Sequence, residues 1–159
     1  MKSPYAALVM WALGARDSAR TSPAARALSR AQTPELVARA VADPAVIRRL
    51  GADVRAERRE GLVRGLAVVF RHRHLRHDSR VPVGAALVHL SDSARAALPV
   101  VIGLSGENTA RVLSNALGQV ARHAGADLIE LVTLLADWDE LDVRERSELL
   151  VDLHTAHRA

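Results

Sequence analysis

Three histidines in the segment RHRHLRH are the first side chains that could do chemistry, as ligands of a metal ion. His72 and His74 are two positions apart, so on a helix they would point to different faces, and His77 follows a further arginine. Zinc sites need ligands that converge on one point, and the neighbouring arginines would repel a cation. The spacing therefore favours a basic segment over a metal site.

A serine between glycines, in the segment GLSGEN that begins at Gly103, could act as a nucleophile. The nucleophile elbow of hydrolases places such a serine between a strand and a helix and pairs it with a histidine and an acid. No strand pattern precedes Ser105, and no histidine or aspartate has a defined spacing from it. The segment predicts the start of a helix, with Ser105 or Gly106 at the cap.

Four acids close to one tryptophan, in the segment DWDELD, could bind the metal ions of a nuclease: Asp137, Asp139, Glu140 and Asp142. Such a site needs a second group of carboxylates at a set spacing, which the chain lacks. The segment instead predicts a turn between helices, with negative charge at the start of the next helix. The sequence also contains no glycine-rich phosphate loop and no cysteine. We therefore expect no catalytic residue, no cofactor and no metal.

Arginine is the residue type whose number and placement stand out. Residues 1–80 carry 16 Lys and Arg against 7 Asp and Glu, a net charge of +9, whereas residues 81–159 carry 6 against 11, a net charge of −5. Ten arginines lie between positions 48 and 80. Such clustering is typical of proteins that contact phosphate. The alternative is that these arginines solvate helix faces and pair with Asp53, Glu57 and Glu60.

The aromatic residues narrow the kind of contact with nucleic acid. Only Tyr5, Trp11, Phe70 and Trp138 are present, mostly within apolar runs, so we expect the last three in the core and no platform on which bases could stack. Contact should then be made by arginine with the backbone, which positions a strand without reading its sequence.

Helix start signals divide the chain into short helices. An N-cap acceptor followed by proline occurs at Ser22, Thr33 and Asp43, and each pair predicts a helix start. The longest helical pattern runs over 52–73, and a polar connector follows it. Further helices are expected over 83–90, over 91–104 with a break at Pro99, and over 107–124, 126–138 and 143–157. Asp142 and Glu145 predict a capping box for the last helix.

These patterns predict an all-α protein of two packed helical bundles with about eight to nine helices. The expected units are an N-terminal basic bundle over 1–90 and a C-terminal bundle over 91–159. The apolar run from Tyr5 to Leu13 is too short to cross a bilayer and predicts a first helix. The lack of cysteine favours a reducing compartment, so we expect a cytoplasmic protein.

Several segments, in this order, resemble the CasB family, the small subunit of the type I-E CRISPR surveillance complex, Cascade. They are the first helix with Trp11, the long helix ending in LAVVF, the segment GAALVHL, and LLADW followed by RERSELLVDL. The resemblance covers essentially the whole chain, and the block from Trp138 through Arg144 to Leu153 is its most specific part. The chain departs from the family in the acidic turn and in having only Arg111 and Arg122 on the helix before Trp138.

The resemblance implies a subunit without catalytic activity that stabilises the opened target in antiviral defence. Its implied partners are the backbone and large subunits, a second copy head to tail, the guide RNA and the target DNA strands, with no membrane and no small-molecule substrate. The uneven distribution of charge would suit the head-to-tail arrangement, because the basic half can face nucleic acid and the acidic half can face a neighbouring protein. The candidate nucleic-acid contacts are Arg55, Arg58, Arg59, Arg71, Arg73, Arg76, Arg80, Arg111, Arg122, Arg144 and Arg146.

For two pairs of these arginines the sequence predicts more than exposure to nucleic acid. Arg55 and Arg59, four positions apart, should share a helix face better than Arg58 and Arg59 do. For Arg144 and Arg146 the alternative is an ion pair within the helix to Glu148. Two other functions stay open: a free-standing helical regulator that binds nucleic acid, which would need a polar recognition helix, and a purely structural interaction module, which would show no salt-dependent affinity for nucleic acid.

Overall fold

The protein is all-α, as its sequence predicts. The structure, a computed structural model, describes residues 3–18, 22–51, 54–123 and 125–158, and within these ranges it contains ten α-helices, three short 3₁₀ helices and no strand. The expected eight to nine helices is therefore slightly low. No helix in the described part of the chain combines the length and apolar character needed to cross a membrane.

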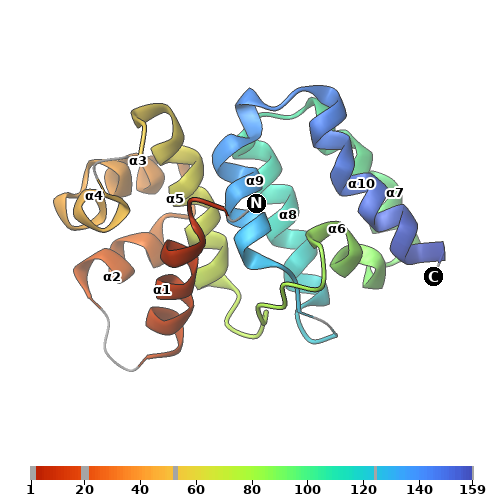
Figure 1. Ribbon diagram of the computed structural model, residues 1–159, viewed down its shortest axis with the longest axis horizontal. Coiled ribbons are helices and arrows are strands. Elements are labelled where there is room, and N and C mark those ends of the chain that lie inside the picture. The colour runs from red at the N-terminus through yellow and green to blue at the C-terminus, as the bar shows by residue number, and fades with distance from the viewer. Residues whose placement is uncertain (1–2, 19–21, 52–53, 124, 159) are drawn as a thin grey trace.

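Four short helices form the N-terminal part of the molecule (Figure 1). The predicted caps at the second, third and fourth are confirmed, because Ser22 Oγ, Thr33 Oγ1 and Asp43 Oδ1 each accept a hydrogen bond from the backbone N–H two or three residues on. Gly51, with φ of +89°, ends the fourth helix in a conformation that favours glycine. The four are α1 (Ala6–Asp17), α2 (Pro23–Arg30), α3 (Pro34–Ala42) and α4 (Pro44–Leu50).

The long helix α5 (Ala56–Arg71) lies at the centre of the molecule. Of the predicted range 52–73, residues 54–55 and 72–73 are not helical, and residues 52–53 lie outside the described part of the chain. Its most extensive partner is α9, which approaches closely at two glycines. A Cβ added to Gly61 would lie 2.5 Å from the carbonyl oxygen of Leu135, and one added to Gly65 would lie 3.1 Å from the Cα of Val132. The close approach of the two helices therefore requires glycine at Gly61, whereas a Cβ at Gly65 would make only a tight contact with Val132.

Helices in the second half of the chain follow the predicted boundaries closely. The expected break at Pro99 is confirmed, because an α-helix ends at Ala97 and a 3₁₀ helix continues from Leu98. The capping box is also confirmed, with reciprocal bonds of 2.8 and 3.3 Å between Asp142 and Glu145. The elements are α6 (Val83–Ala86), η1 (Leu87–His89), α7 (Asp92–Ala97), η2 (Leu98–Gly103), α8 (Gly106–Val120), α9 (Leu128–Asp137), η3 (Trp138–Glu140) and α10 (Val143–Arg158).

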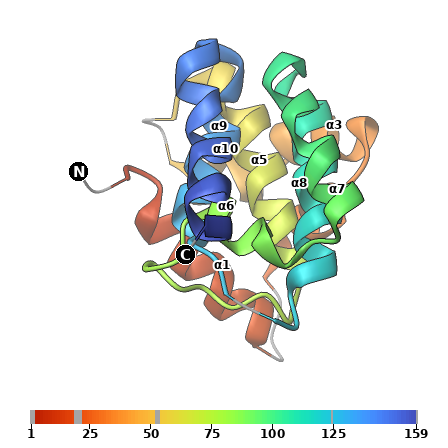
Figure 2. The same cartoon turned by 90° about the vertical axis from the view of Figure 1, so that its right-hand side faces the viewer.

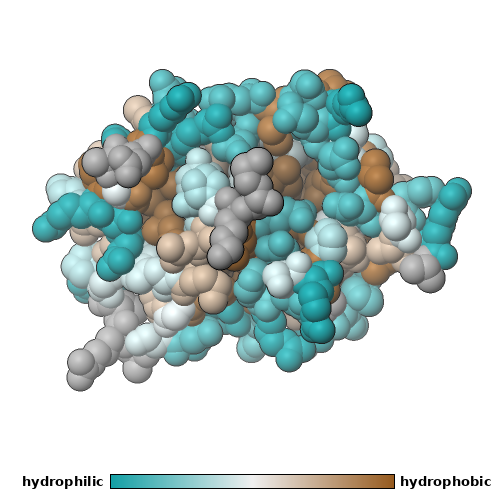
Figure 3. All heavy atoms as spheres, in the orientation of Figure 1, coloured by the Kyte–Doolittle hydropathy of each residue, from teal (hydrophilic) through white to brown (hydrophobic). Residues whose placement is uncertain are grey.

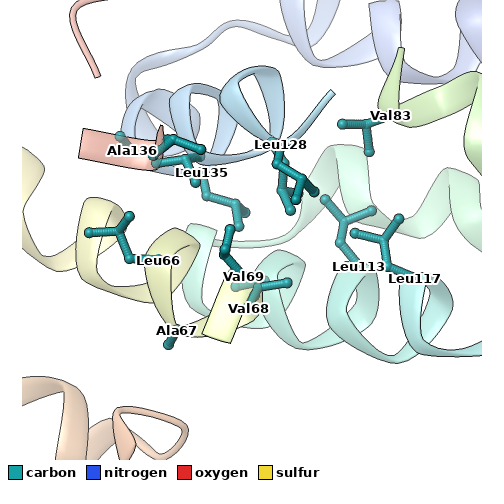
Figure 4. Close-up of a cluster of buried hydrophobic side chains, with 14 of the residues drawn as sticks. Leu66, Ala67, Val68, Val69, Val83, Leu113, Leu117, Leu128, Leu135 and Ala136 are labelled. Carbon is teal, nitrogen blue, oxygen red and sulfur yellow. The ribbon is translucent and has the colours of Figure 1, made fainter. Parts of the chain in front are cut away.

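One hydrophobic core joins both halves of the chain. Figure 4 shows Leu66 and Val69 of α5 beside Leu135 of α9, with Leu113 and Leu117 of α8 next to them. In the same way α6, from the predicted N-terminal unit, packs against α10. Helices of the two predicted units thus share a core, and the boundary at residue 90 stays a prediction.

The aromatic side chains belong to this core, as expected. Trp138 is fully buried, and its indole N–H donates to the carbonyl oxygen of Leu104 at 2.9 Å. Trp11 and Phe70 are half-buried and meet edge to face with ring centroids 6.3 Å apart. Trp138 therefore offers no ring face to a base, and the guanidinium of Arg49 lies over the ring of Trp11 at 4.5 Å.

Candidate nucleic-acid interface

The basic connector that follows α5 lies against the segment that follows α8. Three backbone hydrogen bonds join them: Asp78 N to Ala126 O at 2.9 Å, Ala126 N to Arg76 O at 3.0 Å, and Asp127 N to Val81 O at 2.7 Å. Figures 1 and 2 both show the two segments together at the lower end of the molecule. Because α5 and α8 run in the same direction, their C-terminal ends meet there.

This meeting brings together arginines that are far apart in the sequence. The exposed side chains of Arg73, His74, Arg76, Arg80 and Arg122 form what we name the connector surface. Figure 3 shows hydrophilic residues gathered along the lower edge of the molecule, where the connector runs. The sequence predicts Arg122 near the end of the helix over 107–124 and the other four residues at the end of the long helix and in the connector. Only the contact of the connector with the segment after α8 brings them to one end of the molecule.

One acid lies within the connector surface. Asp78 accepts hydrogen bonds from the side chain of Arg80, with 3.1 Å between Nε and Oδ1. These bonds to the Arg80 side chain and backbone hold the pKa of Asp78 below its usual range. Since the Arg80 side chain is 88% exposed, the pair is solvated and the surface remains strongly positive.

Two side chains beneath the connector hold it in place. Arg16 Nη1 donates to the carbonyl oxygens of Val69, His72 and Leu75 at 3.2, 3.0 and 3.0 Å, which satisfies groups left open where α5 ends. His72 Nε2 in turn lies 2.9 Å from Ser114 Oγ on α8. No sequence pattern marks Arg16 for this role, since its one local signal is a cation in the last turn of α1.

The histidines of this region differ in burial: His72 is half-buried beneath the connector, whereas His89 and His123 lie on the surface. Burial lowers the pKa of His72, and the nearby Arg71 and Arg16 guanidinium groups lower it further. His89 and His123 are exposed, and their rings stack with centroids 5.8 Å apart. No three metal-ligating side chains come together anywhere in the described ranges.

At the opposite end of α5 the predicted contacts have different surroundings. Arg55 is the exposed N-cap residue of α5. Arg58 is bound to Asp137 and Glu140 on the neighbouring helix and turn. Arg59 is half-buried, and its Nε is buried with no hydrogen-bond partner among the described residues. Arg59 is thus less exposed than Arg55, and the expectation that the two contact one strand together stays a prediction.

The two predicted arginines of α10 also differ from each other. Arg144 is exposed. The Arg146 guanidinium donates to the carbonyl oxygens of Trp138, Ile102 and Leu104 at 2.8–3.3 Å, and it lies over the Trp138 ring at 5.0 Å. Arg146 thus fastens η2 and the turn after α9 to the start of α10.

The candidate catalytic groups have structural partners. Ser105 Oγ caps α8 through the N–H of Asn108, as its position predicted. Asp139 Oδ1 accepts a hydrogen bond of 2.7 Å from the N–H of Gly106, at the same helix start. Asp142 caps α10, which confirms the expected turn between helices.

The predicted arginines thus fall into three places: the start of α5, the connector with the ends of α5 and α8, and the starts of α8 and α10. The connector region is the place where most of them are exposed and close together: Arg71, Arg73, Arg76, Arg80 and Arg122. No family model, no curated protein and no solved structure matches this chain.

Proposed function

We propose that this protein is the non-catalytic small subunit of a type I-E CRISPR Cascade complex and that it holds the backbone of a nucleic-acid strand on its connector surface. The observation that carries the proposal is the convergence of exposed arginines from the connector after α5 and from the turn after α8 on one end of the molecule. The segments that resemble CasB support the choice of complex. Exposed guanidinium groups bind phosphate through charge-assisted hydrogen bonds, which suits backbone contact.

Binding should be independent of base sequence. Side chains that could stack on bases are packed into the core, as the burial of Trp138 and the edge contact of Trp11 with Phe70 indicate. The connector surface offers guanidinium and imidazole groups instead. Such a surface suits a subunit that stabilises whichever target the guide RNA has opened.

The exposed arginines are the residues we assign to this contact. Arg58 and Arg146 are omitted because acids and backbone carbonyls of the protein already occupy their guanidinium groups. Arg59 is omitted because it is half-buried. Of the predicted residues, Arg73, Arg76, Arg80 and Arg122 belong to the connector surface, and Arg55, Arg71, Arg111 and Arg144 are exposed outside it and are assigned to further contacts with nucleic acid.

Absence of catalysis and the protein partners are parts of the same proposal. The serine and acids that could have formed an active site serve as helix caps or ion-pair partners, as Ser105, Asp137 and Asp139 do. The acidic second half would face the backbone and large subunits or the basic half of a second copy, in the cytoplasm. Guide RNA and target DNA are the strands that the basic half would meet.

Salt-dependent binding of the purified protein tests the nucleic-acid contact. If four or five phosphates are neutralised, the log-log salt slope with single-stranded DNA should be roughly −3. A variant carrying Arg73→Gln, Arg76→Gln and Arg122→Gln should flatten that slope by about 2 units. The matched control carries Arg26→Gln, Arg39→Gln and Arg48→Gln, which removes the same charge from exposed positions on α2, α3 and α4. Equal effects of the two variants in fluorescence anisotropy would contradict the connector surface.

Co-expression tests the choice of complex. The chain should copurify with the large and backbone subunits of a type I-E complex, and the assembled particle should retain opened target DNA. In the particle, the connector variant should assemble normally but release target DNA faster than the control variant does. Failure to assemble with these subunits would refute the Cascade assignment while leaving the binding result standing.

A further inference from the structure

A small groove lies between α3, α5 and α8, apart from the connector surface. In Figure 1 α5 runs between the other two helices. Alanines line its floor: Ala31, Ala67 and Ala110 are each at most 6% exposed, so no large side chain fills the space. The groove has a cavity volume of about 60 Å³. All of its lining belongs to the described part of the chain.

Charged side chains from two parallel helices surround this groove. Arg71 of α5 and Arg111 of α8 are exposed and line it. Glu107, one turn before Arg111, lies 3.9 Å from the Arg111 guanidinium and 4.0 Å from that of Arg64. Glu60 also binds Arg64, so Arg64 is held by two acids, whereas no acid other than Glu107 pairs with Arg111 among the described residues.

The two contacts of Glu107 with guanidinium groups leave Arg111 only loosely paired and so available to another anion. Both are at the outer limit for an ion pair, where a carboxylate attracts the guanidinium groups without bonding them firmly. A second anion with more charge and more acceptor oxygens would compete with it for Arg111. Thr33 also lines the groove, and since its Oγ1 accepts from the N–H of Leu36, its hydroxyl proton remains free to donate.

We infer that this groove is a specific site for one phosphate group, held by Arg71 and Arg111, and that Glu107 weakens the site as an internal competitor. A water molecule needs roughly 10–15 Å³ of such space, so the groove admits about four to six water-sized atoms. A phosphate group has that size, and a nucleoside is much larger. The inference rests on the proposed function in one respect: the phosphate is assigned to a nucleic-acid strand, although a free phosphate ion carries the same chemistry.

Inorganic phosphate, titrated into the full chain at constant ionic strength, tests the groove by itself. Amide NMR signals of Thr33 and Arg111 should shift along one saturable curve. A variant with Arg71→Gln and Arg111→Gln should lose that curve, and Glu107→Gln should tighten it severalfold. The control, Arg39→Gln with Arg48→Gln, removes the same charge elsewhere and should leave it unchanged. Shifts that do not saturate, or that survive in the groove variant, would overturn the site.

A single-stranded oligonucleotide tests the source of the phosphate. Glu107→Gln should raise affinity for the strand severalfold, and clearly more than Glu148→Gln, which removes one exposed acid from α10. Equal effects of the two would overturn the assignment to a strand even where free phosphate binds. The connector surface is tested separately, on Arg73, Arg76 and Arg122, so its failure can be told apart from failure of the groove.

Discussion

Arg16 Nη1 donates a hydrogen bond of 3.0 Å to the carbonyl oxygen of His72, although 56 positions separate the two residues. Only 5% of the Arg16 side chain is exposed, so a buried cation closes the end of α5 from the adjacent helix α1. His72 also forms a hydrogen bond with Ser114 of α8. The contacts of His72 with Arg16 and Ser114 therefore join α1, the end of α5 and α8 at the point where the basic connector begins. The orientation of the connector surface therefore depends on Arg16.

Replacement of Arg16 should lower the free energy of unfolding much more than replacement of an exposed arginine does. Arg16→Ala removes the donor to the carbonyl oxygens of Val69, His72 and Leu75, of which only that of His72 keeps a second donor within the described part of the chain, the N–H of Leu75. An acceptor left buried without a partner costs about 1–3 kcal/mol. We expect the free energy of unfolding to fall by about 2–4 kcal/mol in a urea titration. Arg26→Ala, at an exposed position of α2, is the control and should change it by less than about 0.5 kcal/mol. Similar losses in both variants would show that the buried contacts of Arg16 contribute little.

The protein should lose stability through His72 as the solution becomes acidic. Its pKa is lowered in the folded state, chiefly by burial and then by Arg71 and Arg16. Below the unfolded pKa of about 6.5 the unfolded chain binds a proton that the folded protein does not, so unfolding becomes easier.

Comparison of the parent with His72→Gln at pH 7.5 and 5.5 isolates this contribution, because burial raises the pKa of Glu130 and of Asp152 in both proteins alike. The parent should lose more unfolding free energy than the variant over this interval, by about 1.4 kcal/mol for each unit of pKa difference fully titrated. Identical pH profiles would mean that His72 is protonated equally well in both states.

Gly84 should not tolerate a methyl group. A Cβ there would lie 2.1 Å from the carbonyl oxygen of Leu149 and 3.0 Å from the N–H nitrogen of Leu153, both backbone atoms of α10. Gly84→Ala must move α6 and α10 apart, and such overpacking costs about 1–3 kcal/mol or more.

Gly14→Ala is the matched control for that substitution. Gly14 lies inside α1 with no atom within 4 Å of the added Cβ, so alanine should stabilise the helix by about 0.5–1 kcal/mol. Thermal melting would show the two variants moving in opposite directions. A rise in melting temperature for Gly84→Ala would contradict the close packing of α6 on α10.

Substitutions of Arg144 and of Arg146 should have clearly different effects on the free energy of unfolding. Arg146→Gln removes donors from three carbonyl oxygens and a cation from the Trp138 ring, so we expect a loss of about 2–3 kcal/mol in unfolding free energy. Arg144→Gln should leave stability within about 0.5 kcal/mol of the parent because its side chain is exposed. The opposite order would place Arg146 on the functional surface and Arg144 in the fold.

Helix starts and breaks were predictable from the sequence because they depend on neighbouring residues. The caps at Ser22 and Thr33 satisfy N–H groups three positions away, and the capping box joins Asp142 to Glu145. The α-helix before Pro99 ends two residues ahead of that proline, at Ala97. All-α architecture and a core that includes Trp138 follow from the same local patterns and from apolar periodicity.

Which arginines face solvent was decided by the tertiary structure alone. Arg58 and Arg73 both lie in the arginine-rich segment of the sequence. Arg58 binds Asp137, 79 positions away, whereas Arg73 is exposed to solvent. Likewise Arg146 and Arg144 share a helix, but only Arg146 meets the carbonyl oxygens of η2 and Trp138. A long cation is equally suited to water, to a carboxylate and to the open end of a helix, so its role depends on which group the fold brings within about 3 Å of it.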